Sequence, residues 1–275
     1  MFSIRDGLSS TQKSRYLQQT ALEDWGEQGQ LELTGKHVVV VGAGGLGNLA
    51  ASFLAGAGVG RLSIIDGDDV ELSNLPRQIA YDLHSIGQAK VHELASRLSA
   101  QNDHIECTPY YESVDAENVF DLIVDCDLVL DCTDNFNARY LINRHCVSEQ
   151  IALLSASVAK WQGQLMLIDP RTRQNGCYEC LYTVSDQIGQ SFSCRDLGVV
   201  GPMVGVLASL QATEALRYLI GATCTLSTQL LCIDGRDMRF QTFNRSRNLD
   251  CPVCSQDLVL KPSPTTRYEE SSSES

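Results

Sequence analysis

The sequence lacks long apolar runs and is poor in positive charge. No apolar stretch approaches the roughly 20 residues that a membrane-spanning helix needs. The opening segment MFSIRDGLSSTQKSRY has none of the apolar character of a signal peptide. There are 21 Lys and Arg against 34 Asp and Glu, which gives a formal net charge of −13. These absences predict a cytoplasmic protein with no membrane and no nucleic acid among its partners, because nucleic-acid binding requires a basic face.

The composition that remains suits one large α/β domain. Of the 275 residues, 43% are hydrophobic, which supports a sizeable core. Short apolar runs alternate with amphipathic or Ala- and Leu-rich stretches, a pattern typical of buried parallel strands joined by helices. We expect strands at residues 36–41, 61–65, 105–111, 128–131 and 152–157, and helices at 46–57, 88–100, 115–124 and 136–148.

The pattern changes after residue 160. Strand candidates at 164–168, 230–233 and 238–243 flank a long helix at 202–220, which begins at a proline and ends before Gly221. We therefore predict a Rossmann-like, doubly wound, mainly parallel sheet with an antiparallel C-terminal extension. Residues 1–35 are expected to be a helical lead-in with one helix at 9–30, residues 36–254 a single domain, and residues 255–275 a disordered polar tail.

The motif GAGGLG predicts a nucleotide-binding loop, because it follows the first strand and opens the first helix. Its glycines let backbone amides approach a phosphate, and the helix N-terminus adds partial positive charge. An aspartate ends the second strand about 20 residues further on, where a carboxylate can hold ribose hydroxyls. The alternative is a glycine-rich packing turn. The candidate residues are Gly42, Gly44, Gly45, Gly47 and Asp66.

Charged groups near other strand ends favour ATP over NAD. The loop lacks the Gly-Lys-Ser/Thr of a P-loop, so a triphosphate needs cations from elsewhere. SNLPRQ and the start of the next helix supply two cations, and DCTDN supplies two carboxylates at a strand end that faces the same crevice. Such a set suits Mg²⁺ with a triphosphate. The alternatives are surface ion pairs for the cations and turn or helix-cap roles for the aspartates. The candidates are Asn74, Arg77, Gln78, Lys90, Asp131, Asp134 and Asn135.

Two C-x-x-C pairs predict a metal site. Cys177 and Cys180 form the first pair, and Cys251 and Cys254 form the second. Four thiolates make a closed tetrahedral Zn²⁺ site with no position left for catalysis. The long stretch between the pairs excludes a compact zinc ribbon, so the site is expected to fasten the C-terminus of the domain to an earlier loop. Two redox pairs, or coincidence, are the alternatives.

The ordered series of motifs resembles the ThiF/MoeB/HesA family, relatives of the ubiquitin-activating enzymes. The likeness rests on SRY, GAGGLG, DGDDVELSNLPRQ, GQAK and DCTDNFNARYLIN, and it runs from about Arg15 to Cys254. Members of that family use ATP to adenylate the C-terminal glycine of a small ubiquitin-like sulfur carrier. The resemblance therefore implies a homodimeric adenylyltransferase that uses ATP, Mg²⁺ and Zn²⁺.

The resemblance also implies roles for individual residues. It places Asp66 on the ribose, with Gly45 and Asn74 lining the ATP site. It implies that Arg77 and Lys90 neutralise the phosphates and that Asp134 acts with Mg²⁺. It makes the four paired cysteines zinc ligands, and it sends Arg15 across a homodimer to the triphosphate of the neighbouring subunit. One departure is that Gln18-Gln19 stands where the family has an Arg-Gln pair.

The reaction that follows requires no protein nucleophile. The carrier's carboxylate attacks the α-phosphorus of ATP and pyrophosphate leaves. The protein must position the two reactants and neutralise charge on the phosphate oxygens. We expect Arg77, Lys90 and Asp134 to carry this step.

Cys194 is a candidate for a later, covalent step. It lies in the polar segment SFSCRDLG beside Arg195 and ahead of the long helix, and both features favour a thiolate. An unreactive loop cysteine is the alternative. The six remaining cysteines lie in or beside apolar strand and helix segments and are interpreted as inert, buried small hydrophobes. The segment resembles the ThiF stretch whose cysteine links to the carrier, and WQGQLM, CPVC and GVVGP are also closest to ThiF. The resemblance thus implies a ThiS-like carrier, thiamine biosynthesis and a separate sulfur donor.

Three rival functions remain. The first is a MoeB-type enzyme that activates MoaD in molybdopterin biosynthesis. The second is an NAD(P)-dependent oxidoreductase, which leaves the cations and carboxylates without a task. The third is an inactive scaffold that only docks a ubiquitin-like protein, against which the intact set of charged residues argues.

Overall fold

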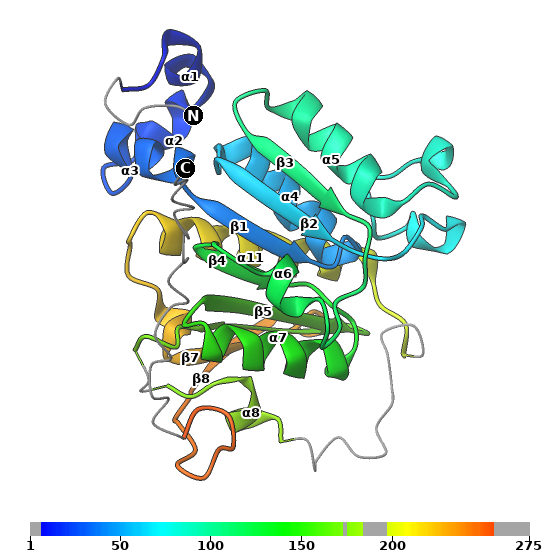
Figure 1. Cartoon of the computed structure of the whole chain (residues 1–275), viewed down its shortest axis with the longest axis vertical. Coiled ribbons are helices and arrows are strands. Elements are labelled where there is room, and N and C mark those ends of the chain that lie inside the picture. Colours follow the sequence, from blue (N-terminus) through cyan, green and yellow to red (C-terminus); the bar gives the residue numbers. More distant parts are fainter. Residues whose placement is uncertain (1–6, 173–174, 184–196, 256–275) are drawn as a thin grey trace, which may run out of the picture.

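The computed structural model describes residues 7–172, 175–183 and 197–255. These residues form one eight-stranded sheet in the order β3-β2-β1-β4-β5-β6-β7-β8 (Figure 1). The pairs from β3 through β5 are parallel, and those from β5 through β8 are antiparallel. The strands are β1 (His37–Val41), β2 (Arg61–Ile65), β3 (Glu106–Tyr110), β4 (Leu128–Asp131), β5 (Ala152–Ala159), β6 (Gln162–Ile168), β7 (Gln229–Asp234) and β8 (Arg239–Asn244).

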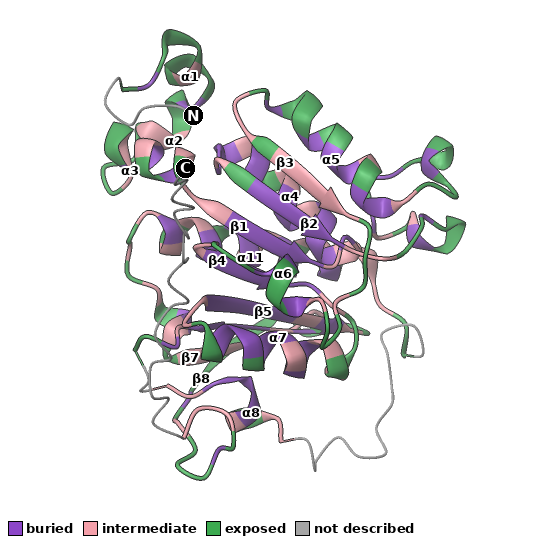
Figure 2. Ribbon diagram, viewed as in Figure 1, coloured by how far each residue is buried: buried purple, intermediate pink, exposed green. Residues whose placement is uncertain are grey.

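Helices cover both faces of the sheet, as the doubly wound prediction requires. Alternate residues of β1 enter two separate apolar cores: Val38 and Val40 pack in one, Val39 and Val41 in the other. The first core includes α4 (Gly45–Ala57), α5 (Lys90–Gln101) and α11 (Gly201–Leu219). The second includes α6 (Val119–Leu122), α7 (Phe136–Ser148) and α8 (Tyr178–Leu181). The buried strands lie between these two layers (Figure 2).

The N-terminal helix predicted over residues 9–30 is wrong in one respect, because the segment forms three short helices. They are α1 (Ser10–Arg15), α2 (Leu17–Thr20) and α3 (Gly26–Thr34). Tyr16 leaves the helical conformation with φ −99° and ψ 12°, and its buried hydroxyl accepts a hydrogen bond from the Asn102 amide. Gly26 has φ +60°, which ends any helix before it. Tertiary anchoring thus overrides the helical propensity of the segment.

The helix predicted over 115–124 is also shorter than expected. Asp115 accepts the amide hydrogens of Glu117 and Asn118 as a turn, and Asp125 adopts φ +48°, so that only α6 remains helical. Short 3₁₀ helices occupy Leu72–Asn74, Leu83–Ser85 and Thr225–Ser227. Nearly all of the tail predicted at 255–275 lies outside the described residues.

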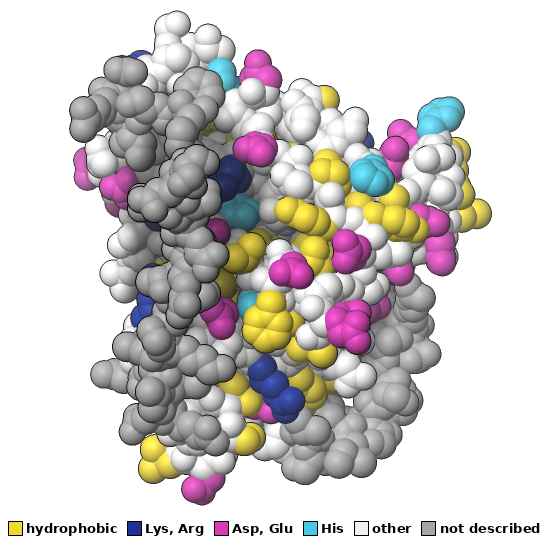
Figure 3. All heavy atoms as spheres, viewed as in Figure 1, with side chains coloured by type: hydrophobic (Ala, Val, Ile, Leu, Met, Phe, Trp, Pro, Cys, Tyr) yellow, Lys and Arg dark blue, Asp and Glu magenta, His cyan; other side chains and the backbone are white. Residues whose placement is uncertain are grey.

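Among the described helices, none combines the length and the apolar character that crossing a membrane requires. On the face seen in Figure 3, acidic side chains are scattered and basic ones are few, in agreement with the net charge of −13.

Candidate nucleotide site and cysteine cluster

A cavity of about 260 Å³ opens where β1, β2 and β4 end, next to the start of α4. Loops after parallel strands meet at this edge, which is where doubly wound folds bind ligands. The predicted residues that line the cavity are Gly42, Gly44, Gly45, Asp66, Asn74, Arg77, Gln78, Lys90, Asp134 and Asn135. Three predicted residues do not line it: Arg15, Gly47 and Asp131.

The glycine loop owes its shape to close backbone contacts. Gly42 has φ +98°, and a Cβ there would lie 2.8 Å from the Cys132 carbonyl oxygen. A Cβ on Gly47 would lie 1.7 Å from the Gly42 carbonyl oxygen, so Gly47 permits packing of the loop rather than ligand approach. Gly44 is the N-cap of α4, which directs the first amides of that 13-residue helix toward the cavity. The loop therefore presents backbone donors to an anion.

Asp66 is held in place by main-chain donors. Its Oδ2 accepts the Ala43 amide hydrogen at 2.7 Å, and its Oδ1 accepts the Asp68 amide hydrogen at 2.8 Å. Burial raises the pKa of its carboxyl, and the Lys90 ammonium opposes that rise. The carboxylate is thus fixed at the end of β2 with lone pairs left for hydroxyl donors such as those of a ribose.

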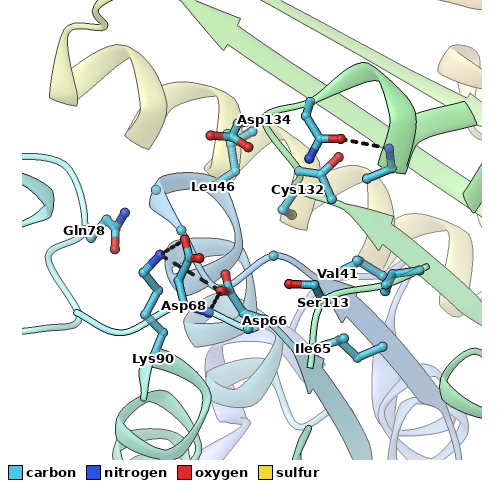
Figure 4. Close-up of a pocket in the computed structure, with 18 of the residues that line it drawn as sticks. Val41, Leu46, Ile65, Asp66, Asp68, Gln78, Lys90, Ser113, Cys132 and Asp134 are labelled. Atoms are coloured by element: carbon cyan, nitrogen blue, oxygen red, sulfur yellow. Dashed lines mark hydrogen bonds and ion pairs between the residues drawn. The ribbon is translucent and has the colours of Figure 1, made fainter. Parts of the chain in front are cut away.

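Lys90 is a buried cation of the cavity. Only 4% of the residue is exposed, and its Nζ lies 2.8 Å from Asp68 Oδ2 and 4.0 Å from Asp66 Oδ1 (Figure 4). Arg77 is half-buried, and its Nη1 donates to the Ser73 carbonyl at 2.9 Å. The buried Gln78 has an Oε1 with no hydrogen-bond partner among the described residues. The two predicted cations and an acceptor without a described partner therefore line the same cavity.

Some polar side chains of the loop after β4 make hydrogen bonds within the fold, and others line the cavity. Asp131 is 1% exposed and accepts hydrogen bonds from the hydroxyls of Ser155 and Thr133, at 2.8 and 2.7 Å. Asn135 accepts the Ala138 amide hydrogen at 2.9 Å and caps α7, although it also lines the cavity. Asp134 is exposed, and no described residue donates a hydrogen bond to its carboxylate. Of the two carboxylates that the sequence predicted for this crevice, only Asp134 faces it, and its oxygens suit Mg²⁺.

Arg15 lies far from the cavity of its own chain. Its Nη1 donates to the Gln101 carbonyl at the end of α5, whereas Lys90 begins the same helix. Twelve residues of helix span about 18 Å, since each adds about 1.5 Å. Cys194, the candidate for covalent chemistry, lies outside the described residues.

The cavity residues that sequence reasoning missed include Asp68, Ser113 and Arg139. Asp68 stands two positions after Asp66 in DGDD, and Arg139 follows Asn135 by one helical turn, so both spacings carried a signal. Ser113 belongs to the loop after β3, and nothing in its local sequence marks it.

The four paired cysteines meet in space. All four Sγ atoms lie within 4.8 Å of one another, with Cys177 Sγ 3.7 Å from Cys251 Sγ and Cys180 Sγ 3.4 Å from Cys254 Sγ. A Zn²⁺ with four bonds of about 2.3 Å has sulfurs about 3.8 Å apart, so the cluster fits the ion. A hydrogen bond from the Cys177 thiol lowers the pKa of the Cys180 thiol, which favours a thiolate at that position.

Comparison with known proteins places these features in context. Residues 16–253 match the model of the ThiF family. The chain is 41% identical over 240 residues to the sulfur carrier protein ThiS adenylyltransferase of Escherichia coli K12, covering 87% of this chain and 94% of that protein. It is 39% identical over 258 residues to the adenylyltransferase and sulfurtransferase MOCS3 of Danio rerio, covering 94% of this chain. The chain spans only 56% of the length of that relative.

A solved structure supports the fold. The structure of Escherichia coli MccB with MccA-N7isoASN superposes with a TM-score of 0.79 at 22% identity, covering 90% of this chain and 76% of that one. The shared fold is an α/β sheet that is parallel in its first half and antiparallel toward its C-terminus.

Proposed function

This chain belongs to the ThiF family, and we propose that it adenylates the C-terminal carboxylate of a small ubiquitin-like sulfur-carrier protein at the expense of ATP. The observation that carries the proposal is the single cavity at which the glycine loop, Asp66, Arg77, Lys90 and Asp134 meet. The names of its relatives in Escherichia coli and Danio rerio support the reaction class. An oxidoreductase would leave Arg77, Lys90 and the exposed Asp134 carboxylate without a catalytic task.

The geometry suits nucleotide transfer without a protein nucleophile. The amides at the start of α4 and the two cations neutralise phosphate charge, while Asp66 orients the ribose. Asp134 would hold Mg²⁺, which neutralises the triphosphate and its leaving pyrophosphate. The carrier's carboxylate attacks the α-phosphorus, the bond to pyrophosphate breaks, and a carrier-adenylate forms. The protein accelerates this step by positioning and charge neutralisation.

The finer assignment in this proposal is a ThiS-like carrier and thiamine biosynthesis. The 41% identity to the ThiS adenylyltransferase over 94% of its length supports this choice. The similar identity to MOCS3 keeps a MoaD-like carrier as the alternative. ATP–pyrophosphate exchange with each carrier in turn tests the assignment. Exchange only with the ThiS-like carrier is expected, and exchange only with the MoaD-like carrier contradicts the thiamine assignment but not the reaction class.

We propose that the active assembly is a homodimer in which Arg15 serves the neighbouring site. Its distance from its own cavity supports this arrangement. Exposed apolar side chains beside the cavity and on α4 and α11 offer a contact surface: Phe53, Leu72, Ile79, Leu83 and Val206. A mixture of Arg15→Ala and Lys90→Ala chains should recover adenylation that neither has alone, because each mixed dimer holds one intact site. No recovery in mixed dimers confirmed by mass would contradict the shared site.

Cys194 is proposed to act after adenylation, when sulfur from a separate donor reaches the carrier. The acyl-adenylate forms without a cysteine, so the two half-reactions separate its role. We expect Cys194→Ala to lose thiocarboxylate formation or a covalent carrier adduct while pyrophosphate exchange persists. A phosphine reductant cleaves an acyl disulfide adduct and leaves a thioester intact, whereas thiols attack both. Full thiocarboxylate production by the variant would remove the residue from the mechanism.

A further inference from the structure

The ion pair between Lys90 and Asp68 is the shortest polar contact of the buried lysine. Lys90 Nζ lies 2.8 Å from Asp68 Oδ2 but 4.0 Å from Asp66 Oδ1. In Figure 4 the lysine reaches from the start of α5 to both aspartates. Asp66 is the more distant carboxylate and is already held by two main-chain amides, so Asp68 is the carboxylate placed to direct the ammonium.

The main chain fixes the two partners relative to each other. The Lys90 amide donates to the Asp68 carbonyl at 3.1 Å, and the Val70 amide donates to the Gln88 carbonyl at 2.9 Å. The Gly87 amide donates to the Val70 carbonyl, also at 2.9 Å. The segment around residues 68–70 is thereby clamped to the segment that begins α5. The lysine side chain is a flexible four-carbon stem that can place its ammonium in many positions. A fixed carboxylate beside the ammonium restricts those positions.

From this arrangement we infer that Asp68 is a positioning residue for the adenylation step: its carboxylate holds the Lys90 ammonium in the orientation that meets the phosphates. The inference rests on the proposed function. An ammonium has three donors, so Lys90 can keep Asp68 on one and offer the others to phosphate oxygens. The half-exposed Asp68 carboxylate adds negative charge beside a polyanion and so does not favour ground-state ATP binding.

These opposing effects predict that Asp68 acts on the rate and not on affinity. Asp68→Asn keeps the shape of the side chain and removes its charge. Single-turnover formation of the carrier-adenylate at saturating ATP should slow about tenfold, because the lysine is no longer aimed at the transition state. The dissociation constant of ATP, measured by calorimetry, should stay equal or fall. A structural role for Asp68 would instead raise that constant.

Matched variants distinguish loss of the Lys90–Asp68 ion pair from loss of a negative charge nearby. Asp69→Asn removes the same charge one residue away, where the carboxylate accepts the Tyr111 hydroxyl and not the lysine, and it should retain the wild-type rate. Asp68→Glu should recover part of the rate. In a Lys90→Ala background, Asp68→Asn should have no further effect, since the pair acts as a unit. An unchanged rate in Asp68→Asn, an equal loss in Asp69→Asn, or an undiminished loss without Lys90 would overturn the inference.

A second measurement does not depend on adenylation. Acetic anhydride acylates a lysine Nζ at a rate that depends on how freely the nitrogen meets the reagent, and the short ion pair with Asp68 restrains the Lys90 Nζ. Mass spectrometry should show faster labelling of Lys90 in full-length Asp68→Asn protein than in the wild type or Asp69→Asn. If the wild type adenylates no carrier, the proposed function fails while the labelling rates still test the pair. Equal labelling in all three proteins would refute the positioning role in either case.

Discussion

The nucleotide cavity and the cysteine cluster are built on opposite principles. The cavity lies in the parallel half of the sheet and leaves polar groups facing open space: the Gln78 Oε1 has no described partner, and the Asp134 carboxylate accepts no described donor. The cluster lies beyond the antiparallel half and turns its four sulfurs toward one another. A site for turnover must leave ligand positions open, whereas four thiolates close a metal site. The first arrangement suits catalysis and the second suits stability.

One helix joins the two regions. At the N-terminus of α7, the Arg139 Nη2 donates to the Thr133 carbonyl at 2.7 Å beside the cavity. Toward its C-terminus, Arg144 binds Glu179 of α8 through two hydrogen bonds of 2.7 and 2.9 Å. Glu179 lies between the first two cluster cysteines. Because α7 contacts both regions, a change in the cluster could in principle reach the cavity. Experiments can therefore test whether the two regions act separately.

The largest effect is expected in the cavity. Asp134→Ala and Arg77→Ala should each lower the adenylation rate about 10²–10³-fold, because preorganised charge at a reaction centre commonly contributes that much. Metal content and melting temperature should remain those of the wild type. Rapid-quench measurement of carrier-adenylate formation checks the rate, with Asp121→Ala as the control for loss of an exposed carboxylate on α6. Near-normal adenylation by folded Asp134→Ala protein would exclude the mechanism.

The cluster should respond in the opposite way. Cys251 is fully buried, and Cys251→Ser should lower zinc content together with stability. We expect a loss near the upper end of the roughly 0.5–3 kcal/mol that single substitutions usually remove. At this chain length each kcal/mol corresponds to about 2–4 °C in melting temperature.

Metal analysis and calorimetry of Cys251→Ser beside Cys232→Ser test this contrast, since Cys232 lies outside the cluster. At temperatures where Cys251→Ser remains folded, adenylation per folded chain should persist. A rate loss as large as that of Asp134→Ala in folded protein would show that α7 couples the two regions. Absence of zinc from wild-type protein purified without chelators would reject the metal site itself.

The sequence predicted the sheet and the glycine loop because both depend on local pattern. Apolar runs gave the strands, and the position of GAGGLG between a strand and a helix gave the cavity edge. The sequence could not show which of the two aspartates of DCTDN faces the cavity. Asp131 turns inward because it accepts a hydrogen bond from Ser155, a residue of another strand. Sequence reasoning also missed Asp68, whose role depends on a lysine 22 residues away.

The N-terminal segment shows the same limit. Its composition favours one helix, but Tyr16 is drawn into the core by Asn102, a partner 86 residues away in the chain. Gln30 adds a hydrogen bond to the Ala57 carbonyl at the end of α4. Contacts between distant segments set these breaks, and no periodicity within residues 9–30 encodes them.

The smallest effect concerns a thiol outside the four-cysteine cluster. Burial raises the pKa of the Cys126 thiol to about 12, well above the value for an exposed cysteine. A thiol with a raised pKa in the folded state stabilises the fold below its unfolded pKa. That contribution is lost progressively as pH rises from the unfolded pKa through the folded value. Between about pH 7.5 and about pH 9.5 the wild type should therefore lose up to about 0.8 kcal/mol through this group, because ionisation favours the unfolded chain. Cysteines that bind a metal are already thiolates and should add no such slope. Urea unfolding at both pH values, compared between wild type and Cys126→Ala, measures the difference. A steeper loss in the variant would contradict the assignment of Cys126 as a half-buried, neutral thiol.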